Sequence, residues 1–281
     1  MNDFAVNAIA EQVLSGINLP PCPATLTSIM REAKSPSADF ASIAKLINRD
    51  VGIVGPLLKL ANSPFIGLKS KATSVFQAIT VLGMQNTLNL VQNIALRQSM
   101  GGGSHNFEKF WERSSLSATI AEKIAVKFPL VSKDSAYITA LFHDCGIPIL
   151  MMKYEDYRKT VMSQCKMGKT ICEVEHEMYS TNHAVVGNML TRNWMLPHQV
   201  SKAILHHHDD TLFTSRDESI NDEVRTLISI VHMAECIADE HMHVTEKEWA
   251  TFERGVLNHL EISPQEFAEM KSDLLAHLNG E

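Results

Sequence analysis

Histidine and carboxylate residues are concentrated in the middle of the chain, and their types suit metal binding. The sequence has 13 histidines, and seven of them fall between His143 and His208. His143 is followed directly by Asp144, at the end of an apolar segment that includes Ile138 and Leu141. An imidazole nitrogen and a carboxylate oxygen are both common ligands of divalent transition metals. The pair His143-Asp144 is therefore a candidate for a metal site, although such a dipeptide alone is common.

A second candidate, His183, shares a helix face with apolar residues. Positions three, four, seven and eleven after it are occupied by Val186, Gly187, Leu190 and Trp194. This spacing predicts that His183 points into the protein. Two interpretations stay open, a metal ligand or a core histidine that is hydrogen-bonded to a backbone carbonyl.

The three consecutive histidines at residues 206–208 are expected to fall on different faces of their helix. His207 lies seven positions after Val200, and His208 lies four positions after Ile204. Both are therefore expected to point inward, and either could also transfer a proton in catalysis. His206 falls on the polar side of this helix and is expected to face solvent.

Two charged residues also fall on apolar helix faces. Glu235 lies four positions after Val231, and a buried carboxylate requires a cation beside it. Arg113 lies seven positions before Ile120, which directs its guanidinium inward. The alternative for Arg113 is a position at the edge of the face, from which the side chain reaches water.

The elements that position these residues are predicted to be helices. Apolar residues follow the i, i+3, i+4, i+7 pattern in three segments, 40–47, 75–82 and 224–231. No stretch alternates with period two between hairpin turns. The predicted fold class is therefore all-α.

Some helix boundaries are also indicated by the sequence. Thr245 with Glu248, and Ser263 with Glu266, have the spacing of capping boxes at helix starts. Asn62, followed by Ser-Pro, is expected to end a helix and begin a turn.

A glycine-rich segment divides the chain. Residues 101–106 read Gly-Gly-Gly-Ser-His-Asn, which is typical of a flexible linker. We therefore expect an N-terminal helical part at 1–100 and a longer C-terminal helical part at 107–281. Whether the two parts fold independently stays open.

Composition excludes several classes of function. The 281 residues carry a net charge of −7 without a basic block, so direct nucleic-acid binding is not expected. No apolar run is expected to reach the roughly 18–20 residues that span a bilayer, and no secretory signal is recognised. The five cysteines form no CxxC pair, which argues against a disulfide framework or a zinc ribbon. A cytoplasmic protein without membrane contact is expected.

Beyond these patterns, the sequence resembles the HDOD branch of the HD superfamily of metal-dependent phosphohydrolases. The similarity covers roughly residues 15–240. It is carried by eight segments, at 19–23, 48–52, 57–63, 78–83, 110–114, 140–146, 183–187 and 203–208. The resemblance implies a multi-helical HD-like bundle with an N-terminal helical subdomain.

The resemblance also implies a ligand set, because binuclear HD enzymes bind two metal ions. His143 and Asp144 match the HD pair, and the additional histidines are matched by His183, His207 and His208. Two positions depart from the pattern. Arg113 stands where the first-helix histidine would be, and Glu235 stands at the position of the last aspartate.

These departures suggest a degenerate site. Arginine is always protonated and has no lone pair for a metal. We hypothesise that Arg113 replaces the charge of the first metal and pairs with Asp144 and Glu235. A second metal (Fe, Mn, Ni or Zn) could still be held by Asp144, His183 and His207 or His208. The expected cofactor is thus one divalent transition metal or none.

Three functions follow from this site. The first is a bacterial signal-transduction module that acts through a protein partner and has little catalytic activity. The second is a metal-dependent phosphohydrolase acting on a nucleotide, a cyclic dinucleotide or a phosphomonoester. The third is a sensor that binds a nucleotide or cyclic dinucleotide without turnover.

Overall fold

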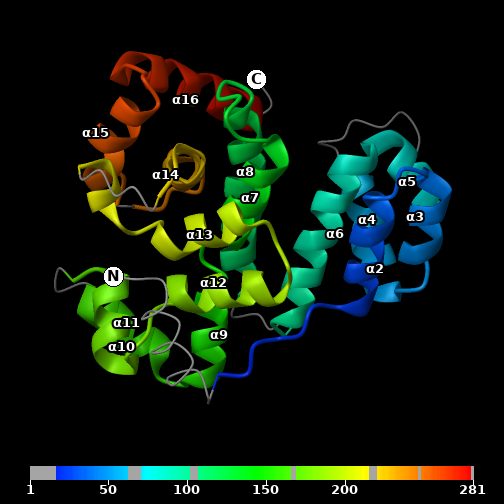
Figure 1. Cartoon of the computed structure of the whole chain (residues 1–281), viewed down its shortest axis with the longest axis horizontal. Helices are drawn as coiled ribbons and strands as arrows, with labels where there is room; N and C mark the ends of the chain where they lie inside the picture. Colours follow the sequence, from blue (N-terminus) through cyan, green and yellow to red (C-terminus); the bar gives the residue numbers. More distant parts are fainter. Residues whose placement is uncertain are drawn as a thin grey trace. The chain divides into compact units, whose positions relative to one another are not determined.

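The computed structural model describes residues 17–62, 71–101, 107–165, 169–214, 220–245 and 248–279. Within these ranges the chain is predominantly helical and has no strand, as the sequence predicts (Figure 1). The described residues form two compact units, one from Pro20 and the other from Phe107 onward. Residues 102–106 of the expected linker lie outside the described ranges.

The N-terminal unit contains five helices whose apolar faces make its core. They are α2 (Ala24–Ala33), α3 (Phe40–Ile47), α4 (Val51–Ala61), α5 (Val75–Leu82) and α6 (Met84–Ser99). The side chains of Asp39, Asp50 and Ser74 cap α3, α4 and α5. The predicted helices at 40–47 and 75–82 are therefore confirmed with these bounds.

Asn62 ends α4, as predicted, and also stabilises the segment that returns to α5. Its side-chain amide donates to the carbonyl of Ala72 at 2.9 Å and accepts from the amide of Ala72 at 2.7 Å. Ser63 and Pro64 lie outside the described residues. The asparagine therefore fixes both ends of the intervening segment to each other.

The C-terminal unit contains the remaining helices. They are α7 (Glu108–Ala125), α8 (Lys133–Phe142), α9 (Gly146–Lys153), α10 (Tyr157–Cys165), α11 (Ile171–Tyr179), α12 (His183–Asn193), α13 (His198–His206), η2 (Asp210–Phe213), α14 (Asp222–His241), α15 (Trp249–His259) and α16 (Pro264–Asn279). Helix α14 packs on α7, α8, α13, α15 and α16 and lies at the centre of this unit (Figure 1). The predicted apolar face at 224–231 is buried there.

One predicted capping box is present, and the other is wrong. Ser263 and Glu266 bond reciprocally, with the amide of Ser263 donating to the Glu266 carboxylate at 2.7 Å and the amide of Glu266 donating to Oγ of Ser263 at 3.2 Å. Glu248 does precede a helix, but its side chain makes no capping hydrogen bond. Instead it bonds to His208, a contact between distant segments that spacing alone does not reveal.

The stretch Lys133–Lys153 is long and apolar enough to cross a membrane by length and composition. The expectation that no stretch reaches this length is therefore wrong. The stretch consists of two helices, α8 and α9, and its side chains are mostly buried in the C-terminal unit. Its apolar character is explained by the core that it forms.

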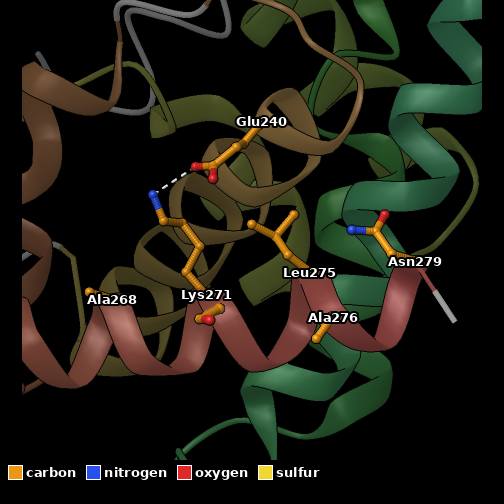
Figure 2. A pocket seen from close by; sticks show the side chains of 7 residues that line it. Glu240, Ala268, Lys271, Leu275, Ala276 and Asn279 are labelled. Atoms are coloured by element: carbon orange, nitrogen blue, oxygen red, sulfur yellow. Dashed lines mark hydrogen bonds and ion pairs between the residues drawn. The ribbon is translucent and has the colours of Figure 1, made fainter. Parts of the chain in front are cut away.

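A surface pocket of about 290 Å³ lies between the end of α14 and α16 (Figure 2). Lys271 of α16 donates to the carboxylate of Glu240 of α14 at 2.7 Å across it. The pocket is lined by Glu240, Ala268, Lys271, Ser272, Leu275, Ala276 and Asn279, and shares no residue with the histidine-rich site.

Candidate metal site

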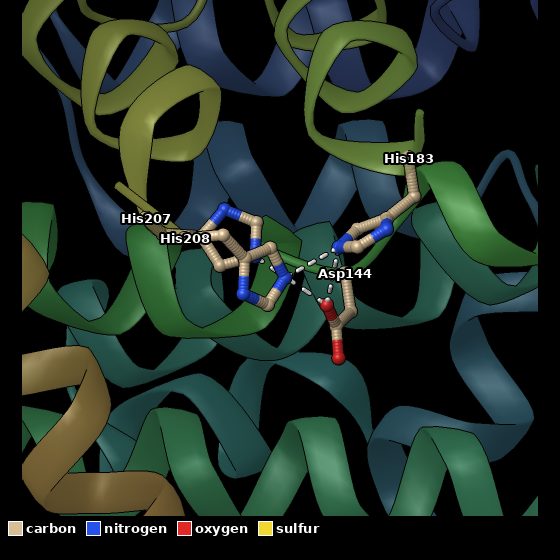
Figure 3. Close-up of side chains that lie close together, drawn as sticks. All are labelled: Asp144, His183, His207 and His208. Carbon is tan, nitrogen blue, oxygen red and sulfur yellow. Dashed lines mark hydrogen bonds and ion pairs between the residues drawn. The ribbon is translucent and has the colours of Figure 1, made fainter. Parts of the chain in front are cut away.

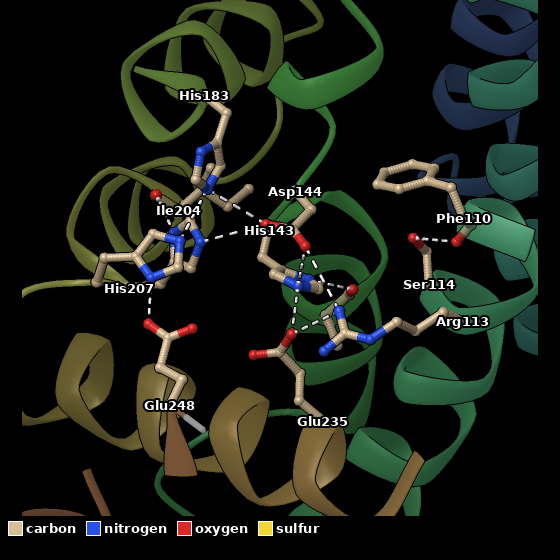
Figure 4. Close-up of polar contacts among 12 residues, drawn as sticks. Phe110, Arg113, Ser114, His143, Asp144, His183, Ile204, His207, Glu235 and Glu248 are labelled. Carbon is tan, nitrogen blue, oxygen red and sulfur yellow. Dashed lines mark hydrogen bonds and ion pairs between the residues drawn. The ribbon is translucent and has the colours of Figure 1, made fainter. Parts of the chain in front are cut away.

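Helix ends and one buried helix bring the predicted site residues together. His143 is the C-terminal cap of α8, and His183 is the first residue of α12. His207 is the C-terminal cap of α13, directly before His208. Glu235 projects from the middle of α14. Helix ends suit this role because their side chains can converge from different directions on one point (Figures 3 and 4).

A glycine permits the close approach of two of these helix ends. A Cβ atom on Gly146, at the start of α9, would lie only 2.1 Å from the carbonyl oxygen of His183. Backbone atoms cannot move away as a flexible side chain could. Glycine at this position therefore lets His183 approach the His143-Asp144 turn.

Four of the residues form one group, which we call the histidine cluster: Asp144, His183, His207 and His208. Their ligand atoms all lie within 4.8 Å of one another (Figure 3). Oδ1 of Asp144 lies 3.3 Å from Nε2 of His183 and 3.6 Å from Nε2 of His207. Nε2 of His183 and Nε2 of His208 are 2.8 Å apart. The cluster thus offers three nitrogens and one oxygen to a single point.

The outer nitrogen of each of these histidines is already occupied by an acceptor. Nδ1 of His207 donates to the carbonyl of Ile204 at 2.7 Å, and Nδ1 of His183 donates to the carboxylate of Glu175 at 2.7 Å. Nδ1 of His208 is bonded to the carboxylate of Glu248. Because a neutral imidazole has only one N–H, Nε2 of His207 and Nε2 of His208 present lone pairs to the cluster, and Nε2 of His183 does so once a metal has displaced its proton. Outer partners of this kind orient histidine ligands in metal sites.

The three Nε2 atoms could bind a metal ion in place of the proton on His183. The buried Nε2 of His207 has no hydrogen-bond partner among the described residues. The lone pairs of His183 and His208 would repel at their separation unless a proton or a metal lies between them. Imidazole and carboxylate ligands suit Zn, Fe, Mn or Ni. The histidine cluster therefore fits a divalent transition metal of unassigned identity.

The other half of the site is filled by a guanidinium, and we call it the arginine pocket. It consists of Arg113, His143, Asp144 and Glu235 (Figure 4), together with Asp239. Arg113 donates to both carboxylate oxygens of Asp239, at 2.6 Å and 2.9 Å. Its Nη1 lies 2.9 Å from Oε1 of Glu235 and 3.5 Å from Oδ2 of Asp144. Arg113 points inward as its spacing predicts and does not extend toward water.

His143 lies against the same carboxylates. Its Nδ1 donates to the carbonyl of Ala140 at 2.7 Å, and its Nε2 lies 2.9 Å from Oε1 of Glu235 and 3.2 Å from Oδ2 of Asp144. Burial lowers the pKa of His143, but the carboxylates of Asp144 and Glu235 outweigh burial and raise that pKa well above its usual value. Without a metal His143 is therefore an imidazolium that pairs with them.

The carboxylates and the remaining histidines complete this charge pattern. Burial raises the pKa of Asp144, but His143 outweighs it, and the pKa lies well below its usual value. Burial lowers the pKa of His207 to about 4 and that of His208 to about 3, so both are neutral at pH 7. For His183, Glu175 outweighs burial and raises the pKa well above its usual value. A metal would have to displace the proton on His183.

Three site residues were not identified from the sequence. Asp239 lies four positions after Glu235 on α14, so its place on the same helix face was a signal that could have found it. Glu175 lies in a segment with acidic neighbours and gave no signal. Glu248 was interpreted as a helix cap. His206 is half-buried, so the expectation that it faces solvent is wrong.

Comparison with known proteins agrees with this helical architecture. A structure of an HDOD domain protein from Geobacter sulfurreducens aligns with a TM-score of 0.71 at 19% identity, covering 99% of each chain. A provisionally named phosphohydrolase of Shewanella amazonensis SB2B aligns with a TM-score of 0.72 at 18% identity, covering 95% of this chain and 94% of that one. A provisionally named signal transduction protein of Marinobacter aquaeolei VT8 aligns with a TM-score of 0.76 at 17% identity, covering 98% of this chain and 64% of that one. These likenesses show a shared HD-like helical fold.

The family follows from the sequence match. The family model of the HDOD domain matches residues 19–210, so this chain belongs to the HDOD family. An uncharacterised protein of Treponema pallidum (strain Nichols) is 25% identical over 195 residues. That match covers 68% of this chain but only 38% of the length of the relative.

Proposed function

We propose that this protein is a regulatory HDOD module of a bacterial signalling pathway and that it has little or no phosphohydrolase activity. The single observation that supports this most directly is the position of Arg113. Its Nη1 contacts Glu235 at 2.9 Å and lies 3.5 Å from Asp144, beside the Nε2 atom of His143. The guanidinium thus takes the place of a metal ion among the residues that match the first metal site of HD enzymes.

Ligand atoms of His143, Asp144 and Glu235 lie within 4.8 Å of one another, but Arg113 acts against a metal ion among them. The guanidinium has no lone pair, and it is held by two hydrogen bonds to Asp239. A divalent cation placed among the same oxygens would be repelled by it. The arginine pocket therefore does not fit a metal, and no step of a reaction is assigned to one there.

The histidine cluster remains able to hold one divalent transition metal. Its ligands would be Asp144, His183, His207 and His208. When bound, such an ion supplies Lewis acidity to an oxygen of a phosphate or carboxylate group. A pair of ions that clamps the attacking and leaving oxygens of a phosphodiester is not available. Metal binding without efficient hydrolysis is the expected behaviour.

The pathway context is part of the same proposal. We infer that the module acts in the cytoplasm, that a protein partner brings in the signal, and that a nucleotide or cyclic dinucleotide could serve as its ligand. Acidic net charge and the absence of a basic block argue against nucleic acid as the partner.

The test combines metal content with turnover. Protein purified without chelators should contain at most one divalent transition metal per chain and should not hydrolyse a panel of phosphodiesters in added Mn²⁺, Fe²⁺ or Ni²⁺. In the variant Arg113→His the pocket gains a second imidazole beside that of His143, and a second metal should bind. Two ions per wild-type chain together with turnover would overturn the proposal.

The alternative function, a metal-dependent phosphohydrolase, has one observation in its favour. The histidine cluster is complete, and His207 and His208 are neutral, so whichever of the two did not bind the metal could accept a proton. Hydrolysis of a nucleotide, cyclic dinucleotide or phosphomonoester that disappears in both His143→Ala and Asp144→Ala would favour this function. A saturable thermal shift with a nucleotide and no product would instead favour a sensor.

A further inference from the structure

The start of helix α15 contacts the histidine cluster directly through Glu248 and indirectly through His232. Glu248, the residue before α15, is bonded to Nδ1 of His208, forty residues earlier in the chain. One turn later on α15, the ring of Phe252 stacks on His232 with centroids 3.8 Å apart. Nε2 of His232 in turn donates to the backbone carbonyl of His207 at 2.7 Å. His208 is thus held by Glu248 at the start of α15, and His207 is held through His232, which packs on the same helix.

The outer partner of His208 differs from those of the other two histidines. His207 donates to a backbone carbonyl within its own helix turn, and Glu175, the partner of His183, is fully buried. The side chain of Glu248 is 30% exposed, and that of His208 is 18% exposed. His208 is therefore the ligand whose orientation depends most on a single partly exposed side chain.

We propose that Glu248 is a positioning residue of the histidine cluster, which fixes the tautomer and the ring orientation of His208 for a divalent transition metal. This inference rests on the proposed metal site. Glu248 lies beyond residues 19–210, which the HDOD model matches, so the segment after the match completes the site. Glu235 and Asp239 of the arginine pocket come from the same additional segment.

Glu248 matters for metal binding because it decides which ring nitrogen of His208 carries the proton. With the carboxylate present, the N–H of His208 is on Nδ1, and its Nε2 lone pair faces His183. Without the carboxylate, either nitrogen can carry the proton, and the partly exposed ring can turn toward water. Loss of an outer partner of this kind typically weakens metal binding by roughly 10–100-fold.

The experiment uses Co²⁺ as the probe, because its visible absorption bands report the number and geometry of ligands. The full chain and the variant Glu248→Ala are titrated with Co²⁺, and affinity is measured by competition with a chelator. The variant should bind roughly 10–100-fold more weakly, with shifted or weakened visible bands. Glu248→Asp should recover part of the affinity and the wild-type band positions.

Matched controls separate the outcomes. Glu253→Ala removes an exposed glutamate from the same helix and should titrate as the wild type does. If Glu248→Ala folds poorly, Glu248→Met takes its place, because methionine keeps roughly the size of the side chain but offers no carboxylate or amide oxygen to Nδ1 of His208. Wild-type affinity and spectrum in these variants would overturn the positioning role and leave the metal site intact. Failure of the wild type to bind Co²⁺ would overturn the proposed site itself.

Discussion

The arginine pocket and the histidine cluster share Asp144 but satisfy it in opposite ways. On one side Oδ2 faces the guanidinium of Arg113 and the ring of His143, which are cations supplied by the chain. On the other side Oδ1 faces nitrogens of His183 and His207 whose outer N–H groups are already bonded. One half of the site is thus neutralised by folding, whereas the other is prepared for an added ion.

The two halves of the site should contribute differently to the stability of the folded protein. The carboxylates of Glu235 and Asp239 are buried, with side-chain exposures of 6% and 3%, and Arg113 contacts both. A covalently attached cation is present as soon as the chain folds. The arginine pocket should therefore contribute to folding without metal, and the histidine cluster should gain stability only when a metal binds.

The largest expected effect comes from removing the internal cation. Arg113→Ala leaves Asp239 and Glu235 buried without their main partner, and the free energy of unfolding should fall by about 3–5 kcal/mol. Urea denaturation measures this loss. Arg158→Ala, an exposed arginine on α10, is the control and should change stability by less than about 0.5 kcal/mol. A loss no larger than the control would show that the pocket does not need its cation.

The next effect tests the histidine cluster. His207→Ala removes a buried nitrogen that has no hydrogen-bond partner among the described residues and that should bind the metal directly. Loss of a residue that only orients a ligand weakens metal binding by at most roughly 100-fold, so loss of His207 should weaken it by more. Competition with a chelator measures this change. His198→Ala, on the exposed face of α13, should leave the affinity unchanged. Equal affinities in the two variants would contradict the assigned ligand set.

A smaller effect concerns the approach of α9 to α12. Gly146→Ala places a methyl group 2.1 Å from a backbone carbonyl and should destabilise the protein by about 1–3 kcal/mol while weakening metal binding through His183. Thermal unfolding and metal titration measure the two effects. Gly187→Ala should be milder, because its nearest neighbour is a side-chain methyl of Ile204 at 3.1 Å. The reverse order would show that this contact does not position His183.

The smallest effect concerns the outer partner of His183. The hydroxyl of Tyr157 donates to Glu175, which also accepts from the backbone amide of His183 at 2.9 Å. Tyr157→Phe should therefore reduce the free energy of unfolding by about 1 kcal/mol and leave the metal affinity within a few fold. Tyr154→Phe, in the same stack of rings, is the control. A large loss of affinity would mean that Glu175 alone does not orient His183.

Helical periodicity was sufficient to predict the fold class and the direction of several site residues. His183 and Glu235 are buried, and Arg113 points inward, because each lies on an apolar face whose spacing is local information. The resemblance to HDOD proteins also matched these residues to the ligands of a metal site. The predicted site residues do lie together, although whether they bind metal stays a prediction.

The partners that decide the chemistry came only from the tertiary structure. Arg113 is separated from Asp239 by 126 residues, and His208 is separated from Glu248 by 40. Helical periodicity shows which way a side chain points but not which other helix it meets. The packing of α7, α14 and α15 therefore decided which carboxylate each cation or histidine would contact, since such contacts depend on how helices cross in space rather than on their separate sequences.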